Sequence, residues 1–187
     1  MKKLLLKPKE KDLQLTLKDF ENPELIEEIE ILSKKTQTIN IHNWSSPLKR
    51  IKVQSPLSEF PQLENIEELE LLKITGSSIS KIPKLNKLNC KKLYLQRNKL
   101  SRFSFQSLDI QILEELDLSN NQISEFEINT FELGLKRLNL ENNNLASLPK
   151  ETFQLKNLLS IGLKGNPFSE EEKLEIKKCF NIDLFNG

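Results

Sequence analysis

The sequence has little of what most catalytic and metal sites are built from. It contains one histidine, His42, and two cysteines, Cys90 and Cys179, which do not form a CxxC pair. One histidine and two separated cysteines do not make a metal ligand set, and no serine or cysteine lies in a nucleophile motif. We therefore expect no metal, no cofactor and no enzymatic activity. Both cysteines are expected to be small buried apolar side chains, with a disulfide or metal site as the weaker alternative.

Long apolar runs and an excess of one charge are also missing. No stretch approaches the roughly 20 apolar residues that span a bilayer. The first residues, MKKLLLKPKEKD, are too short for a secretory signal because charge returns at Lys7. A net charge of +1 and a pI near 7.7 make nucleic-acid binding a minor alternative. We expect a cytoplasmic monomer without a membrane segment, or a secreted or surface protein if a leader has been removed.

What the sequence does contain is a repeat of the form LxxLxLxxNxL. It is clearest in LEELDLSNNQI, from Leu113 to Ile123, and in LKRLNLENNNL, from Leu135 to Leu145. Six units begin 21 to 23 residues apart, at positions 48, 69, 90, 113, 135 and 158. A unit of this length cannot bury its own apolar face and must stack on its neighbours. The period therefore predicts a solenoid.

Each unit also predicts its own local structure. The LxL part alternates as a half-buried strand does, so successive units should build a curved α/β solenoid with a parallel sheet on its concave face. The convex side should be irregular or form short helices, and Phe131 with Leu133 and Phe153 with Leu155 should line that wall of the core. A buried amide can bond the backbone of its own and the adjacent turn, which predicts a ladder of Asn98, Asn121, Asn143 and Asn166.

The first 47 residues do not share the repeat. Asp12–Lys18 and Thr36–Ile41 alternate as strands do, and Asn22-Pro23 is typical of a helix start for a segment that runs to about Lys34. These features predict an N-terminal β-α-β cap over residues 1–47, which would cover the open end of the solenoid. Trp44 is expected to pack at the junction with the first repeat.

The last residues predict a second cap. Ser169 and Glu172 have the spacing of a capping box, and the segment SEEEKLEIKKCF has acids early and lysines late, as the helix dipole favours. The repeats should therefore occupy residues 48–168, and a capping helix with its tail should occupy residues 169–187.

The stretch from Leu148 to Cys179, LPKETFQLKNLLSIGLKGNPFSEEEKLEIKKC, resembles the repeat and terminal helix of bacterial leucine-rich-repeat proteins. Its LPKE-x-x-QLKNL phrase is similar to the Leptospira-type subgroup. The resemblance implies a solenoid whose concave sheet binds other proteins, in a group associated with host interaction. The sequence departs from the family pattern at Pro56 and Ser77, where asparagine is expected, and at Phe103 and Phe126, where leucine is expected.

The outward strand positions define a candidate binding face. The first three strands carry cations only, whereas the last three carry anions and cations, with Leu71 and Tyr94 between the two zones. Strand faces of any soluble solenoid must be polar, but aromatic anchors supply most interface energy. Clustered carboxylates on this face, such as Glu115 and Asp117, are expected to be solvated and ordinary. We therefore expect a non-enzymatic scaffold for a host or bacterial protein, with an enzyme or nucleic-acid accessory module as the alternative. The candidate residues are Arg50, Lys52, Leu71, Lys73, Lys92, Tyr94, Glu115, Asp117, Arg137, Asn139 and Glu141.

Overall fold

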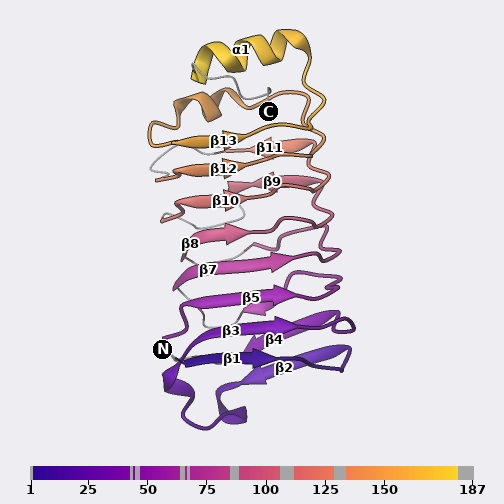
Figure 1. Ribbon diagram of the computed structural model, residues 1–187, viewed down its shortest axis with the longest axis vertical. Coiled ribbons are helices and arrows are strands. Elements are labelled where there is room, and N and C mark those ends of the chain that lie inside the picture. Colours follow the sequence, from indigo (N-terminus) through magenta and orange to yellow (C-terminus); the bar gives the residue numbers. More distant parts are fainter. Residues whose placement is uncertain are drawn as a thin grey trace.

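The fold is a solenoid in which each turn of the chain adds one parallel strand to a single long sheet (Figure 1). The computed structural model describes residues 2–42, 44, 47–63, 66, 68–84, 89–105, 112–128 and 134–180. Its main sheet has eight strands, which follow each other in chain order: β1 (Lys2–Leu6), β3 (Ile26–Leu32), β5 (Arg50–Gln54), β7 (Glu68–Thr75), β8 (Asn89–Tyr94), β10 (Glu115–Asp117), β12 (Arg137–Asn139) and β13 (Ser160–Gly162).

The pairing of these strands confirms the predicted repeat register. The fourth residue of each unit lies opposite the fourth residue of the next, as Leu93 lies opposite Leu116 and Leu116 opposite Leu138. These side chains point into the core and are at most 2% exposed. Burying one leucine of this kind contributes roughly 1.5 to 3 kcal/mol. Stacking equivalent positions therefore gives every turn the same apolar contact with both neighbours.

The predicted N-terminal β-α-β cap is wrong. Ile26–Leu32, expected to be helical, is strand β3, and only Pro23–Leu25 forms one turn of 3-10 helix, η2. Ile29 and Ile31 are fully buried and alternate with glutamates, which is the period of a strand. A short apolar run fits both periods, and the β-branched isoleucines here favour the strand. The main sheet therefore runs past residue 47 to β1, with β3 paired to β5 over five residues.

The two predicted strands of this region are confirmed, but they lie in the other wall of the solenoid. β2 (Asp12–Thr16) pairs in parallel with β4 (Thr38–His42), which pairs with β6 (Gln62–Leu63). Further along the chain, β9 (Arg102–Ser104) pairs with β11 (Glu125–Glu127). Each turn thus runs along the main sheet and returns along this back wall, and the core lies between them.

Aromatic residues fill the core behind the later repeats. Phe103 and Phe126, the departures from the family pattern, are 2% and 6% exposed, and their rings stack with centroids 5.9 Å apart. Phe105 packs edge-on against Phe103 at 5.1 Å. Beyond them, the 3-10 helix η4 (Lys150–Gln154) leads to Leu155, which is buried as predicted. The predicted wall residues Phe131 and Leu133 lie outside the described residues.

The predicted asparagine ladder is present at the inner edge of the turns. Nδ2 of Asn121 donates to the carbonyl of Leu118 in its own turn at 2.9 Å and to that of Leu95 in the preceding turn at 3.0 Å. Its Oδ1 accepts the backbone N–H of Leu100 at 3.1 Å. Asn143 repeats all three contacts one turn later. Each amide therefore satisfies buried backbone groups of two turns at once, and Asn98 and Asn166 donate in the same way.

In the earlier turns, serine hydroxyls occupy the ladder position in place of asparagine amides. Ser77 Oγ donates to the carbonyl of Ser55 at 2.6 Å, and Ser55 Oγ donates to the carbonyl of Thr36 at 2.6 Å. The turn after β5 is one residue shorter than the others, so Ser55 rather than Pro56 occupies the ladder position. A hydroxyl has one donor where an amide has two. The sequence pattern fades here because the turn is bonded by a different side chain.

The residue before each later ladder position has a left-handed backbone. Gly76, Arg97, Asn120, Asn142 and Gly165 have φ values of 68°, 59°, 56°, 54° and 75°. A Cβ placed on Gly165 would lie 2.2 Å from Oδ1 of Asn142, so any other residue there would displace that amide as well as strain the backbone. The sharp inward turn thus requires both a positive φ and a buried side-chain donor one residue later.

The predicted capping helix closes the C-terminal end as α1 (Glu170–Phe180). Ser169 Oγ accepts the backbone N–H of Glu172 at 3.1 Å, as a capping box requires. The Glu172 carboxylate accepts the backbone N–H of Leu148 at 2.9 Å and so ties the helix to the preceding turn. Ile176 is the fully buried residue of this helix, and the ring centroid of Phe180 lies 5.5 Å from that of Phe153.

Cys90, Trp44 and Cys179 were each predicted to be buried, and the first two are. Cys90 is buried, as predicted, and burial raises the pKa of its thiol to about 11. Trp44 is 1% exposed and packs 5.8 Å from the ring of Phe20. Cys179 was expected to be buried but is exposed, because it lies on the outer side of α1.

Replacing a ladder asparagine should destabilise the solenoid far more than replacing its neighbour. Asn121→Ala leaves backbone groups of two turns unpaired, so we expect a loss of about 1 to 3 kcal/mol in the free energy of unfolding. Asn120→Gly is the matched control, since glycine accepts the positive φ that alanine would strain, and its effect should stay below about 0.5 kcal/mol. Urea titrations measure both, and equal losses would show that the ladder does not stabilise the fold.

Removing α1 should uncover the end of the core. Without residues 169–187, the buried side chains of Leu163 and Phe168 meet solvent. Because a terminal cap keeps a solenoid soluble, the shortened chain should self-associate, which sedimentation velocity detects. A monomeric chain with an unchanged melting temperature would contradict this role of α1.

Candidate functional site

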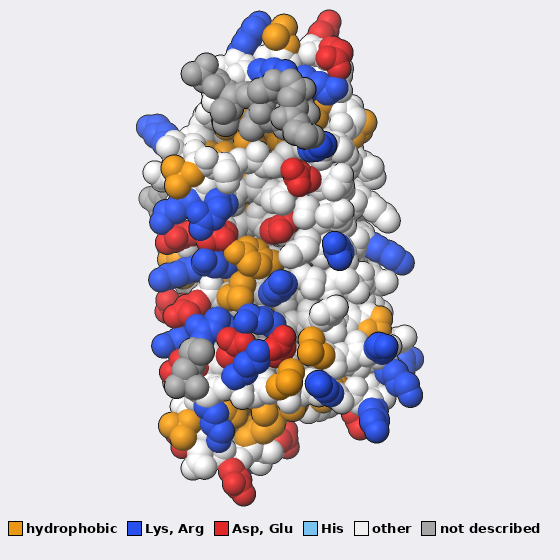
Figure 2. All heavy atoms as spheres, viewed as in Figure 1, with side chains coloured by type: hydrophobic (Ala, Val, Ile, Leu, Met, Phe, Trp, Pro, Cys, Tyr) orange, Lys and Arg blue, Asp and Glu red, His pale blue; other side chains and the backbone are white. Residues whose placement is uncertain are grey.

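The predicted binding residues lie together on the outer face of the main sheet, which we define as its outward side chains. In the first row, counted along the strands, neighbouring strands bring together Lys3, Glu28, Arg50, Leu71, Lys92, Glu115, Arg137 and Ser160. The second row contains Leu5, Glu30, Lys52, Lys73, Tyr94, Asp117, Asn139 and Gly162. Glu141 follows Asn139 beyond the end of β12. Figure 2 shows blue and red side chains alternating along one side of this face.

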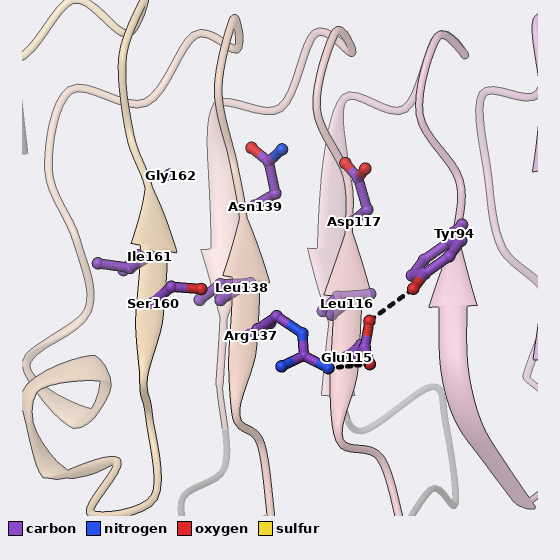
Figure 3. Close-up of a pocket in the computed structure, with 10 residues that line it drawn as sticks. All are labelled: Tyr94, Glu115, Leu116, Asp117, Arg137, Leu138, Asn139, Ser160, Ile161 and Gly162. Carbon is purple, nitrogen blue, oxygen red and sulfur yellow. Dashed lines mark hydrogen bonds and ion pairs between the residues drawn. The ribbon is translucent and has the colours of Figure 1, made fainter. Parts of the chain in front are cut away.

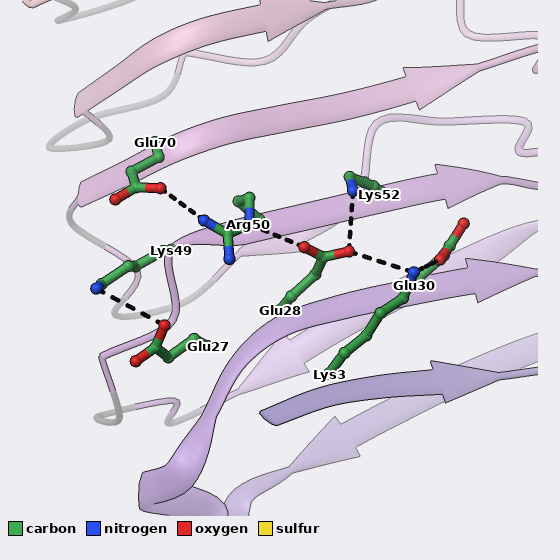
Figure 4. A network of polar contacts seen from close by, with 8 residues as sticks. All are labelled: Lys3, Glu27, Glu28, Glu30, Lys49, Arg50, Lys52 and Glu70. Carbon is green, nitrogen blue, oxygen red and sulfur yellow. Dashed lines mark hydrogen bonds and ion pairs between the residues drawn. The ribbon is translucent and has the colours of Figure 1, made fainter. Parts of the chain in front are cut away.

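A buried carboxylate organises the N-terminal part of the outer face. Glu28 is 4% exposed, and its carboxylate accepts hydrogen bonds from Nε of Arg50 at 2.8 Å and from Nζ of Lys52 at 2.9 Å (Figure 4). It also forms an ion pair with Nζ of Lys3 at 3.4 Å. Burial raises the pKa of Glu28, but the bonds from Arg50 and Lys52 outweigh it and hold the pKa at about 2. Arg50 also reaches Glu70 at 2.7 Å.

This network corrects the predicted cationic zone. Arg50 and Lys52 are neutralised by a glutamate of β3, the segment predicted to be helical. The alternation of Glu28 and Glu30 with Ile29 and Ile31 is the signal that places these carboxylates on the sheet. Among the predicted cations, Lys73 has no ion pair or hydrogen bond within the described part of the chain.

A second buried carboxylate organises the C-terminal part. Glu115 is 7% exposed, and its carboxylate accepts hydrogen bonds from the guanidinium of Arg137 and, at 2.5 Å, from the hydroxyl of Tyr94 (Figure 3). The carboxylate also forms an ion pair with Nζ of Lys92 at 2.8 Å. The bond from Arg137 is the main cause that lowers its pKa to about 2, against the effect of burial. The expectation that this carboxylate is solvated and ordinary is therefore wrong. Three donors on neighbouring strands converge on it because the repeat places them in register.

The Tyr94 side chain is half-buried, and its hydrogen bond to Glu115 fixes its position. Burial, followed by the Glu115 carboxylate, raises the pKa of its phenol to about 12. Its ring is half-buried in the second row, with Lys73 opposite on β7 and Asp117 opposite on β10. Leu71, also half-buried, lies on β7 in the first row. These two side chains form the apolar centre of the outer face.

Beside Tyr94 the outer face is hollowed. A cavity of about 380 Å³ lies over β8, β10, β12 and β13, and Gly162 leaves its far side open. A Cβ at Gly162 would come within 2.8 Å of Oδ1 of Asn139, so the glycine gives that amide its place. The cavity is lined by Tyr94, Glu115, Leu116, Asp117, Arg137, Leu138, Asn139, Ser160, Ile161 and Gly162.

The one histidine of the sequence lies on the back wall, away from the outer face of the main sheet. Nε2 of His42 is 2.9 Å from Oε1 of Gln14, and both residues belong to strands of the back wall. Within the described residues, no three His, Cys, Asp or Glu side chains are grouped so that they could hold a metal ion. In that same part of the chain, no helix is long and apolar enough to cross a membrane.

Repeat register, parallel sheet and asparagine ladder together define the class: the chain is a leucine-rich-repeat solenoid. Residues 113–133 and 134–155 match the Leucine Rich Repeat family. The fold is similar to that of the leucine-rich-repeat protein LIC12759 of Leptospira interrogans, at 23% identity and a TM-score of 0.62 over 88% of this chain and 55% of that one. The resemblance to the Leptospira type is thus confirmed at the level of the fold.

A second solved structure, the LRIM1/APL1C complex, has 18% identity and a TM-score of 0.44 over 90% of this chain and 41% of that one. The chain spans about half the length of the solved structures it matches. No curated protein matches the sequence.

The buried Glu115 should make stability depend on pH in acid. Its pKa is lower in the folded chain, at about 2, than the ordinary value of 4.5. Its contribution is therefore complete above about pH 4.5 and is lost as the pH falls towards 2. Glu115→Gln should lower the free energy of unfolding at pH 6 by on the order of 2 kcal/mol, with a smaller difference from the parent at pH 2.5.

Urea titrations at pH 6 and pH 2.5 measure this difference. Glu127→Gln is the matched control, because this exposed carboxylate of β11 has no ion pair among the described residues. The control should follow the parent at both values. A gap between Glu115→Gln and the parent that stays constant with pH would contradict the account.

Proposed function

We propose that the chain is a non-enzymatic protein-binding module and that its partner contacts the outer face of the main sheet. Solenoids of this class commonly present their extended sheet to other proteins. Eight strands about 4.8 Å apart give a face roughly 34 Å long, which suits a standard interface of about 20 to 30 residues per side. A host or bacterial protein is the partner that we expect.

The observation that carries the proposal is the apolar centre formed by Leu71 and Tyr94. Both side chains are half-buried in the middle of a charged face, and Figure 2 shows hydrophobic side chains at that place. The bond from Tyr94 to Glu115 fixes its ring before any partner arrives, so little side-chain entropy is lost on binding. Rigid aromatic side chains at the centre of a face are typical interface anchors.

The charge pattern favours a protein over a nucleic acid. Phosphate recognition needs free cations, whereas Arg50, Lys52, Lys92 and Arg137 are all bonded to Glu28 or Glu115. Paired ions of both signs next to an apolar centre suit the mixed surface of another protein.

Photo-crosslinking tests the proposal, because it captures whichever protein lies against a chosen position. A benzoylphenylalanine placed at Leu71 or at Ser160 reports on the outer face, and one at Glu127 reports on the back wall. In extracts of the source cells, we expect a discrete protein adduct from the outer-face positions, which excess unlabelled chain suppresses. Adducts from Glu127 alone would move the binding site to the back wall.

Two variants should then change the binding of the crosslinked partner in different ways. Tyr94→Ala removes the anchor and should raise the dissociation rate, at a cost of about 2 kcal/mol. Lys73→Glu changes the one predicted cation without a partner among the described residues, so it should mainly change the association rate, and the effect should fade as salt rises. Lys99→Glu, an exposed turn residue, is the charge-matched control. Surface-binding kinetics at two salt concentrations separate these effects, and parental kinetics for both variants would contradict the proposal.

A further inference from the structure

Two carboxylates beside the hollow are left without a counter-ion among the described residues. Glu115 takes both neighbouring cations, Arg137 and Lys92. Asp117, one position further along the same strand, accepts only the backbone N–H of Ser119, at 3.0 Å. Within the described residues, no lysine or arginine pairs with Asp117 or with Glu141. The outer face therefore has a paired first row and, over β10 and β12, an unpaired anionic region.

The hollow has its own set of fixed polar groups. Oδ1 of Asn139 accepts the backbone N–H of Glu141 at 3.0 Å, just as Asp117 bonds Ser119 one turn earlier. The side chains of Asp117 and Asn139 consequently point the same way, as Figure 3 shows. The next strand carries Gly162 in this row, so the column of side chains ends and the cavity opens there. The groups around the opening are thus oriented by the backbone itself.

We propose that this hollow receives an arginine side chain from an extended segment of the protein partner. The inference rests on the proposed function and names the chemistry of one contact. A guanidinium can stack on the Tyr94 ring and bond the free carboxylate oxygen of Asp117, the two groups being opposite each other on neighbouring strands. The Glu141 side chain approaches the Gly162 side of the same opening. The cavity, at about 380 Å³, is at the small end of ligand sites and fits one long side chain.

Charge complementarity decides between arginine and the other occupants. An anion would meet Asp117 and Glu141, and the one cation among the described residues that line the cavity is Arg137, whose guanidinium already bonds Glu115. An apolar side chain would remove water from two unpaired carboxylates without replacing their hydrogen bonds, which is costly. A guanidinium supplies both the charge and the donors that these groups lack, and its flat face matches the ring.

Selection from a displayed library of random dodecapeptides on the immobilised full chain tests the inference. We expect the enriched peptides to share an arginine and to bind the Asp117→Asn/Glu141→Gln variant at least tenfold more weakly than the parent. Glu127→Gln/Glu151→Gln is the matched control: it changes net charge equally, at exposed carboxylates off the outer face, and should bind as the parent does. Replacing the shared arginine by glutamine should abolish binding. Urea titrations verify that both double variants are folded.

The outcomes separate this inference from the proposed function. Peptides that depend on Tyr94 but bind the Asp117→Asn/Glu141→Gln variant as tightly as the parent would overturn the arginine contact and leave the outer face as the binding surface. Peptides indifferent to both Tyr94→Ala and the double variant would count against both proposals. A selection that yields no peptide dependent on Asp117 and Glu141 would likewise overturn the arginine contact.

Discussion

The hydrogen bond from a buried side chain to the backbone of the preceding turn is the constraint on which the rest of this solenoid depends. Where the chain leaves the main sheet and turns inward, its carbonyls point into the core and need donors. Asn121 and Asn143 supply two donors and one acceptor each, whereas Ser55 and Ser77 supply one short bond. These bonds fix where each turn lies relative to the last, and the leucines then stack because the turns do.

The same stacking determines the chemistry of the outer face. Because equivalent positions of successive turns lie side by side, a glutamate such as Glu28 or Glu115 meets the cations of neighbouring strands and becomes the buried centre of a network. Those networks hold Tyr94 in place and take up the nearby cations. Within the described residues, Lys73 opposite the Tyr94 ring on β7, and Asp117 and Glu141 on the β10 and β12 side, are left without a counter-ion. Under the proposed function, the ions that the repeat leaves unpaired would be the ones that contact the partner.

The sequence predicted the repeats better than it predicted the site. A strict leucine and asparagine period marks a turn that stacks on its neighbours, so the main-sheet strands from β5 to β13, the ladder and α1 were predictable, whereas the back-wall strands β6, β9 and β11 were not. The turns that begin with β1 and β3 were not, because the residues directly after either strand include no asparagine and the short apolar run from Ile26 fits the period of a helix as well as that of a strand. That error hid Glu28 and gave the false cationic zone. The burial of Glu115 depends on side chains more than twenty residues away, which no local pattern reports.

Native-state hydrogen exchange tests the ladder most directly. The backbone N–H groups of Leu100, Ile123 and Leu145 donate to the amide oxygens of Asn121, Asn143 and Asn166, respectively. If these bonds hold the turns together, the three amides should exchange only when the whole chain unfolds, with opening free energies equal to that of global unfolding. Exchange at the rate of exposed turn amides, in a chain that is otherwise folded, would show that the ladder is not what joins one turn to the next.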